Sequence, residues 1–370
     1  MPIKVLAISD YREFHSVRPE AEIFIGLKKL GLDVHIMTYG DCEYAQRFKD
    51  VGIKVIDFHP QAKFDKEEQQ FIRETLEKEQ YDIIHLFNSR AIIHGIRAAK
   101  GLDTKVVLYR GYSGNIHWYD PTAYLKFLHP RVDAIMCNSL GVEEIIRRQK
   151  LYNKQKAVTI NKGHRPEWYS GVEPSNIREE FNIPEDAFLL INVANNRRMK
   201  GIPYLLKAMN ELPEGLNIHL ILLGKRMDTP ENMEIINDGP YKDNIHLPGF
   251  RPDALSVVAS SDVFVLPSIM GESITKSVIE AMSLEKAPII TDIAGNVELV
   301  EDGESGLVVP KKDHTALAEA ILKLYEDRTL TKKLAENAKL RIQTELSTDK
   351  TITKVKELYE ELLEKKETVR

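Results

Sequence analysis

Cysteine is scarce in this sequence, and long hydrophobic runs are absent. Its 370 residues include two cysteines, Cys42 and Cys137, whose separation fits neither a metal-binding nor a redox motif. Cys137 stands in an apolar segment, where a cysteine usually belongs to the core. No run of about 18 apolar residues occurs, so the sequence predicts no transmembrane helix. The composition therefore implies neither a disulfide framework nor a membrane-spanning segment.

A signal peptide and a strong excess of one charge are also missing. The N-terminus, MPIKVLAISDYR, leads directly into an apolar strand, so we expect a cytoplasmic protein. The net charge of −5 is modest, and we expect no nucleic acid partner. The exception is the stretch from Arg147 to Arg165, with seven basic residues and no acidic one. It fits a solvated helix end and loop, or a surface that attracts a phosphate-bearing molecule or the anionic inner face of a membrane.

The sequence does contain a regular alternation of apolar strands and amphipathic helices. In the first half, strands such as IKVLAI, DVHIMT, DIIHLF and KVVLY are separated by helical patterns, including those over 21–30 and 66–79. The second half repeats this order with FLLINVA, NIHLILLG, DVFVLP and PIIT. Such alternation predicts an α/β fold with parallel sheets covered by helices on both faces. Ligands are then expected at the carboxyl ends of the strands.

The length and one interruption of the periodicity predict two domains. A chain of 370 residues can bury two cores of ordinary size. The alternation stops at NKGHRPEWYSGVEPSN, where Pro166, Gly171 and Pro174 break any regular pattern. We expect four parts: an N-terminal Rossmann-like domain over 1–163, a linker over 164–176, a C-terminal Rossmann-like domain over 177–348, and a final helix over 349–370.

One stretch in the second half, PSIMGESITKSVIEAM from Pro267 to Met282, combines a strand end, a short loop and a helix start. The unpaired N–H groups of a helix start favour a phosphate. Glu272 and Glu280 flank it, and carboxylates are good acceptors for sugar and ribose hydroxyls. The combination suggests a ligand that carries sugar, diphosphate and ribose together. A structural alternative is that Ser277 and Glu280 form a capping box and Glu272 favours the helix dipole.

This stretch resembles the Glu-x7-Glu motif of the retaining glycosyltransferases of family 4. The similarity continues through EAMSLEKAPIITDIAGNVELVEDGESGLVVP, so that it covers residues 267–310 without a break. It implies the GT-B fold, in which two Rossmann-like domains face a cleft and the last helix returns to the first domain. It also implies transfer of a sugar from a UDP- or GDP-linked donor to a carbohydrate or glycolipid acceptor, as in cell-surface polysaccharide synthesis.

The resemblance assigns donor-binding roles to several residues. Glu272 would bind the donor sugar and Glu280 the ribose. Lys200 matches the Lys-Gly that binds the diphosphate in the family. The family's arginine falls here on Asn195, so Arg197 or Arg198 is expected to replace it. Ile274 and Thr275 occupy the positions where the family has Phe-Gly, and Lys276 follows them. Phe250 and Arg251 lie in a loop that is expected to bind the nucleotide base. These five residues are the remaining donor-side candidates.

The charge of the leaving diphosphate must be stabilised without an Asp-x-Asp motif, because the sequence has none. We therefore expect no metal and no other cofactor. Lys200, an arginine and the helix N-terminus over 274–277 would stabilise the charge that develops on the diphosphate. No nucleophile is evident. The resemblance implies reaction on one face of the sugar, with the leaving phosphate oxygen helping to deprotonate the acceptor hydroxyl.

The first half would supply the acceptor side, where the sequence departs from the family. The loop after the first strand, where many members have Gly-Gly, contains Arg12 and His15. Arg110 stands before a glycine at a strand end, where many members have His-Gly, and we expect it to contact donor phosphate or acceptor. Further acceptor-side candidates are His117, Trp118 and His164. Each has the alternative of simple packing, since a lone histidine or aromatic residue is more often structural.

Two other functions remain open from the sequence. A nucleotide-sugar epimerase of the GT-B fold would need acid and base residues around the sugar carbons, and no matching motif is present. A non-catalytic sugar-nucleotide-binding scaffold would explain the departures from the family's glycine motifs. A labelled donor separates the three functions, since it would yield a new glycoside, an isomerised donor, or binding without turnover.

Overall fold

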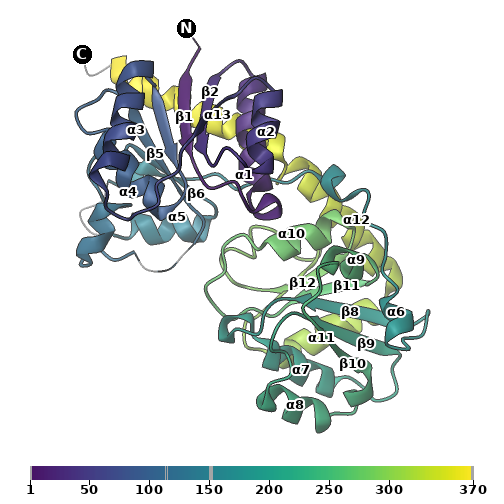
Figure 1. Cartoon of the computed structure of the whole chain (residues 1–370). Helices are drawn as coiled ribbons and strands as arrows, with labels where there is room; N and C mark the ends of the chain where they lie inside the picture. The colour runs from purple at the N-terminus through teal and green to yellow at the C-terminus, as the bar shows by residue number, and fades with distance from the viewer. Residues whose placement is uncertain (1, 113, 115, 150–152, 368–370) are drawn as a thin grey trace. The chain divides into compact units, whose positions relative to one another are not determined.

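The computed structural model describes residues 2–112, 114, 116–149 and 153–367 (Figure 1). The chain divides into two compact units. The first contains Met1–Gly163 together with Ser347–Arg370, and the second contains His164–Leu346. Each unit carries one parallel β-sheet with helices on both faces, which confirms the predicted α/β class with two Rossmann-like domains.

The first unit is built on a seven-stranded sheet with the order β3-β2-β1-β4-β5-β6-β7. Every described pair is parallel. The central strands β1 and β4 are almost entirely buried, which explains their continuous apolar sequences. The strands are β1 (Lys4–Ile8), β2 (Asp33–Thr38), β3 (Lys54–Asp57), β4 (Ile83–Leu86), β5 (Lys105–Arg110), β6 (Ala134–Cys137) and β7 (Ala157–Thr159).

The helices of the first unit include one whose start differs from the expectation. It was predicted over 21–30 but begins at Phe14, so that Pro19 lies inside the helix rather than at its boundary. Pro19 is buried, which shows that packing against the sheet overrides the local helix-breaking tendency. The helices are α1 (Phe14–Lys29), α2 (Glu43–Asp50), α3 (Lys66–Glu79), α4 (Ser89–Ala98), α5 (Leu140–Arg147), and the short 3-10 helices η1 (Pro121–Leu125) and η2 (Lys154–Lys156).

The last helix, α13 (Thr348–Glu367), completes the core of the first unit. It packs against α1, where a side chain at Gly26 would overlap Ile352. Tyr359 is fully buried, and its hydroxyl lies 2.7 Å from Nδ1 of His85 on β4. Segments that begin and end the chain therefore share one hydrophobic core.

The second unit has a six-stranded parallel sheet with the order β10-β9-β8-β11-β12-β13. Alternate residues of β8 face two different clusters: Phe188 and Leu190 pack with α7, α8 and α11, whereas Leu189 and Ile191 pack with α9 and α10. Figure 1 shows α7 and α8 on the opposite side of this sheet from α9 and α10. The strands are β8 (Phe188–Val193), β9 (Ile218–Leu223), β10 (Ile245–Gly249), β11 (Val263–Leu266), β12 (Ala287–Thr291) and β13 (Leu307–Val309).

The second unit also contains the stretch between the two predicted domains and the helices that cover its sheet. The stretch expected as a linker, 164–176, belongs to the second unit, where η3 packs against α10 and α12. The helices are α6 (Ile177–Glu180), α7 (Ile202–Glu211), α8 (Pro230–Asn237), α9 (Ala254–Ala259), α10 (Lys276–Ser283), α11 (His314–Glu326), α12 (Arg328–Thr344), and the 3-10 helices η3 (Pro166–Tyr169), η4 (Arg198–Lys200) and η5 (Lys242–Asn244).

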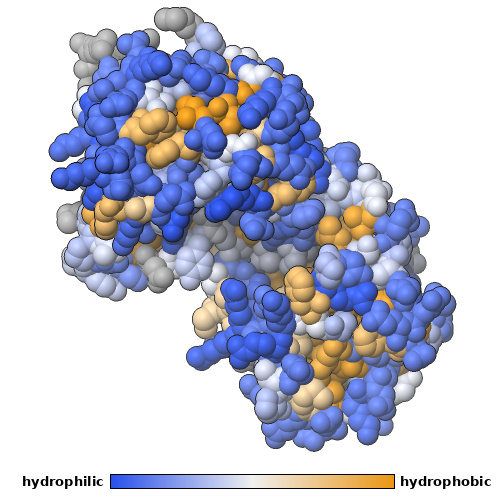
Figure 2. Space-filling view, viewed as in Figure 1, coloured by the Kyte–Doolittle hydropathy of each residue, from blue (hydrophilic) through white to orange (hydrophobic). Residues whose placement is uncertain are grey.

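The surface that Figure 2 displays is mainly hydrophilic, with separate hydrophobic patches on it. Among the described residues, no helix combines the length and the apolar character needed to cross a membrane. Cys137 is buried, and burial raises the pKa of its thiol to about 12, as expected for a core cysteine.

Candidate active site

Two loops meet at the carboxyl edge of the second sheet. One follows β11 and carries Glu272, and the other follows β8 and carries Lys200 at the end of η4. Gly201 adopts a left-handed conformation with φ 66°, and a side chain there would overlap the carbonyl oxygen of Pro267. Only glycine allows this close approach. The Lys-Gly pair therefore fixes the distance between the two loops.

This approach brings Lys200 and Glu272 into direct contact. The Lys200 Nζ lies 2.6 Å from Glu272 Oε1, and both side chains are largely buried. Ser268 donates a hydrogen bond to the same carboxylate oxygen at 2.8 Å, and the Thr275 hydroxyl lies 3.3 Å from Oε2. A carboxylate fixed in this way keeps lone pairs for ligand hydroxyls, and an ammonium keeps N–H donors for an anion. The two residues that the sequence associates with sugar and diphosphate thus form one centre.

Glu280 lies on α10, and its carboxylate is 2.6 Å from the Lys276 ammonium. The capping-box alternative is wrong, because Thr275 precedes the helix and Ser277 lies inside it. The helix also begins two residues later than expected, at Lys276, so Ile274 and Thr275 remain in the loop. Glu280 is mostly buried and is free of any capping role.

Thr275 stands where the resemblance leads one to expect glycine, and the structure explains how it is accommodated. Its side chain is buried, with the hydroxyl 3.3 Å from Glu272 and 3.2 Å from Oδ1 of Asn296. Asn296 is fully buried, and its Nδ2 has no hydrogen-bond partner among the described residues. Sequence reasoning missed Ser268 and Asn296 as supports of Glu272. The only available signal was their position inside the stretch that matches the family.

The two candidate arginines of this edge are exposed. Among the described residues, neither Arg197 nor Arg198 forms an ion pair or a side-chain hydrogen bond. Asn195, the residue at the family's arginine position, accepts a hydrogen bond from the backbone N–H of Lys225 at 3.1 Å. Asn195 therefore links the η4 loop to the loop after β9. The positive charge expected at this position is carried by Arg197 and Arg198 instead.

The loop after β10 contains the two residues expected to bind the base. Phe250 is 64% exposed, and the Lys225 ammonium lies 5.2 Å from its ring centroid. An exposed aromatic ring of this kind is free to stack on a ligand. Arg251 is different, because Glu180 binds it at 2.6 Å and Asp253 at 2.8 Å. These ion pairs weigh against a donor contact by Arg251.

In the first unit, the guanidinium of Arg110 binds carbonyl groups of its own loop. Its Nε donates to the carbonyl of Tyr112 at 2.7 Å, and it also bonds to the carbonyl of Gly114. The guanidinium lies 4.7 Å from the Phe127 ring centroid, and burial lowers its pKa. Arg110 therefore holds the loop after β5 in place, which argues for a positioning role rather than a contact with substrate.

The acceptor-side candidates divide into exposed and buried residues. Arg12 pairs with Asp10 at 2.7 Å and lies over Tyr39, while His15 is exposed beside Phe14. His117 is exposed and stacks on Tyr119, and Trp118 is 40% exposed. His164 is 3% exposed, with its Nδ1 2.7 Å from the Tyr169 hydroxyl. The ring of His164 is packed inside the second unit, which weighs against a contact with a ligand.

The basic stretch from Arg147 to Arg165 is largely engaged within the protein. Arg147 pairs with Glu143 at 2.7 Å, Arg148 pairs with Glu144 at 2.7 Å, and Lys156 bonds to main-chain carbonyls. Lys162 pairs with the buried Glu20 at 2.7 Å. Lys150 lies outside the described residues. These contacts favour the structural interpretation of the stretch.

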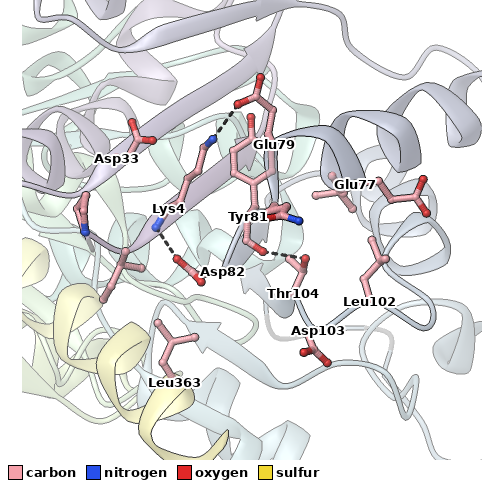
Figure 3. A pocket seen from close by; sticks show the side chains of 14 residues that line it. Lys4, Asp33, Glu77, Glu79, Tyr81, Asp82, Leu102, Asp103, Thr104 and Leu363 are labelled. Atoms are coloured by element: carbon pink, nitrogen blue, oxygen red, sulfur yellow. Dashed lines mark hydrogen bonds and ion pairs between the residues drawn. The ribbon is translucent and has the colours of Figure 1, made fainter.

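A large cavity lies away from the predicted ligand edge. It measures about 960 Å³ and is found at the amino ends of β1, β2, β4 and β5 (Figure 3). Lys4 binds Glu79 at 2.7 Å and donates its backbone N–H to Asp82 at 2.8 Å. The cavity's main charged contacts are thus internal, and it offers no chemistry related to the carboxyl edge. A second cavity of about 520 Å³ lies in the second unit.

Comparisons with known proteins find glycosyltransferases for both halves of the chain. Residues 174–341 match the model of glycosyl transferases group 1, and residues 21–168 match glycosyltransferase family 4. The putative glycosyltransferase EpsD of Bacillus subtilis is 23% identical over 94% of both chains. An N,N'-diacetylbacillosaminyl-diphospho-undecaprenol alpha-1,3-N-acetylgalactosaminyltransferase of Campylobacter jejuni is 26% identical over 80% of this chain and 83% of that protein.

Solved structures show the same fold. A glycosyltransferase from Rickettsia africae is 19% identical, covers 98% of this chain and 99% of its own, and has a TM-score of 0.79. HepE from Anabaena, in complex with UDP, is 19% identical, with coverages of 97% and 100% and a TM-score of 0.77.

Proposed function

The chain belongs to the family 4 glycosyltransferases with the GT-B fold, and from this premise we propose that it is a retaining enzyme that uses a nucleotide-diphosphate sugar. The acceptor in this proposal is a hydroxyl of a carbohydrate or glycolipid in polysaccharide synthesis. The names of similar proteins support that choice, since one acts on a diphospho-undecaprenol-linked sugar and another is a capsular polysaccharide biosynthesis glycosyltransferase.

The observation that carries the proposal is the contact of Lys200 with Glu272 at the carboxyl edge of the second sheet. Donor binding would place the diphosphate at Lys200 and the sugar hydroxyls at Glu272, with Glu280 toward the ribose. Arg197 is exposed on the same loop and is available for the diphosphate. The start of α10 adds backbone N–H donors.

In this proposal the protein stabilises charge rather than attacking the sugar. The bond between the anomeric carbon and the diphosphate oxygen breaks, and its electron pair leaves with the diphosphate. The acceptor oxygen bonds to the same face of the carbon, and its proton passes to the departing phosphate oxygen. Lys200 gains interaction energy as negative charge develops, which lowers the barrier. We propose that no metal is needed, and unchanged activity with a chelator tests that point.

UDP is the first nucleotide to test, because the similar Anabaena protein was determined with UDP and with UDP-glucose. A nucleotide that binds only the folded state raises its melting temperature. We expect one of UDP, GDP and ADP to do so at millimolar concentration, and Glu280→Ala to abolish the shift. Absence of any shift would contradict the donor site.

A labelled nucleotide sugar then tests the reaction. A new glycoside supports transfer, an isomerised donor identifies an epimerase, and binding without turnover identifies a non-catalytic scaffold. Glu272→Ala should remove transfer, and a cooperative thermal transition would show that the fold persists although the contacts with Lys200 and Ser268 are lost. Near-normal turnover in this variant would show that the site is misassigned.

Contact with a membrane surface is a further part of the proposal. A glycolipid acceptor is presented at a bilayer, and Tyr112, Trp118 and Tyr119 expose large side chains in the loop after β5. Aromatic side chains are well suited to the membrane interface. Liposome sedimentation should show binding that Trp118→Ala weakens, with Phe71→Ala as an exposed aromatic control outside this loop. Equal binding by the two variants would remove this part of the proposal.

A further inference from the structure

The second unit contains a cavity of about 520 Å³ on the α7 and α8 side of its carboxyl edge. Residues that follow four different strands line it: Asn196 after β8, Thr229 after β9, Met270 after β11 and Lys312 after β13. Its volume falls within the roughly 300–1,000 Å³ typical of small-molecule sites. Glu272 and Glu280 do not line it, so the cavity is distinct from the centre proposed to bind the donor.

The cavity is strongly cationic. Arg198, Lys207 and Lys312 line it, and in the described part of the chain none of the three pairs with a carboxylate. Glu231 is the only acidic residue among those that line it. The lysines of the adjacent centre differ, because Lys200 is paired with Glu272 and Lys276 with Glu280. Three unpaired cations around one hollow raise the local potential and favour an anion.

The walls of this cavity are fixed by the fold. Gly201 is held against Pro267, and Asn232 is buried with its Nδ2 bonded to the carbonyl of Met227 at 2.8 Å. Lys312 has a φ of 64°, a left-handed conformation that is uncommon for residues other than glycine. Such a backbone persists only where the surroundings determine it. The backbone that carries Lys312 and the buried Asn232 are therefore held in place by their surroundings.

One wall is apolar rather than charged. It is formed by Pro203, Ile269 and Met270, and the large Met270 side chain is 48% exposed. Tyr204 adds an aromatic ring with a hydroxyl. An inorganic ion alone would leave this wall in contact with water. A ligand with a carbon body and a polar rim would cover it, as a sugar ring does.

We propose that this cavity binds a sugar phosphate at a site separate from the nucleotide. A phosphate dianion offers three acceptor oxygens to the three cations, whereas a carboxylate offers two. The sugar would lie against the apolar wall, with Asn196, Tyr204 and Thr229 available to its hydroxyls. Of the residues assigned to the donor, Arg198 alone is among those that line the cavity, whereas Lys200, Glu272 and Glu280 are not.

Calorimetric titration of the full chain with glucose 6-phosphate tests the site. We expect saturable binding that persists in the presence of UDP and in Glu280→Ala. Glucose and inorganic phosphate should each bind at least tenfold more weakly, because each lacks one half of the recognised group. The double variant Lys207→Gln, Lys312→Gln should weaken glucose 6-phosphate at least about tenfold, since each charged hydrogen bond is worth roughly that much or more.

The control is Lys311→Gln with Lys333→Gln, which removes the same charge from exposed positions that do not line the cavity. It should bind glucose 6-phosphate within twofold of the wild type. The proposal is overturned by equal binding in the two double variants, by competition between UDP and glucose 6-phosphate, or by the absence of binding at millimolar concentration. Equal affinity for inorganic phosphate and glucose 6-phosphate would overturn the recognition of the sugar.

Discussion

The carboxyl edges of the two sheets share an architecture but differ in how their charges are used. In the first unit, Arg12 pairs with Asp10, Lys162 pairs with Glu20, and Arg110 binds loop carbonyls. In the second unit, several cations at the same kind of edge have no carboxylate partner among the described residues: Arg197, Arg198, Lys207 and Lys312. The three cations named at the first edge thus have partners within their own unit, whereas these four at the second edge are open to an anion.

The largest effect should come from the buried pair of the first unit. Lys162→Met leaves Glu20 buried without its cation, and within the described part of the chain Oε1 of Glu20 already has no hydrogen-bond partner. We expect the free energy of unfolding to fall by about 3–5 kcal/mol, measured by urea denaturation. Arg12→Ala breaks an exposed pair and serves as the control, with an expected loss of about 0–1 kcal/mol. Similar losses in the two variants would contradict the proposed use of Lys162.

The next effect belongs to the second edge and concerns rate rather than stability. Lys200→Ala should reduce kcat with a labelled donor on the order of a hundredfold, because about 2–4 kcal/mol of transition-state stabilisation is lost. Lys332→Ala, at an exposed position of α12, should leave kcat unchanged. If both variants keep normal turnover, the second edge does not stabilise the leaving group.

A third test uses pH. Burial, followed by the nearby His219, lowers the pKa of His246 to about 4. A histidine with a lowered folded-state pKa stabilises the protein fully above its unfolded pKa of about 6.5, and this stability is lost as the pH falls toward 4. We expect this histidine to account for a loss on the order of 1–3 kcal/mol over that range. His246→Phe should reduce the pH dependence of the urea midpoint.

The exposed His15 provides the control for that measurement. His15→Phe should leave the pH dependence of the urea midpoint as it is in the wild type. An unchanged slope in His246→Phe would show that protonation elsewhere in the molecule dominates the acid sensitivity.

The smallest effect should arise within the loop that carries Glu272. Thr275→Val keeps the shape but removes the hydroxyl that lies near Glu272 and Asn296. We expect the free energy of unfolding to fall by about 1–2 kcal/mol, since one buried hydrogen bond is lost. Thr275→Ser keeps the hydroxyl and should recover most of that loss. A melting temperature equally low in both variants would mean that the methyl group matters and the hydroxyl does not.

Much of the fold was predictable because it depends on local patterns. Apolar strands such as Val263–Leu266 alternate with helices, and that order alone indicates a parallel sheet. The position of Glu272 and Lys200 at strand ends followed from the same alternation, and the resemblance supplied their roles. Contacts between distant residues were hidden, since no local pattern shows that Thr275 meets Asn296.

The same limit applies to the candidate list. Arg110 and His164 are polar residues at expected strand and loop positions, which is all that a sequence reveals. Whether such a side chain faces a ligand or its own loop depends on packing, here against Phe127 and Tyr169. The helix predicted over 21–30 likewise begins earlier, at Phe14, because the buried face of α1 decides where that helix begins.

The return of α13 to the first unit has a consequence for the order of folding during synthesis. The second unit is a continuous segment, so it has all its residues as soon as Leu346 leaves the ribosome. The first unit must wait, since Ile352, Val355 and Tyr359 belong to its core but are made after the second unit is complete. Until then, the side of α1 around Gly26 is uncovered. The half of the chain that is translated first therefore cannot complete its core until the last helix has been made.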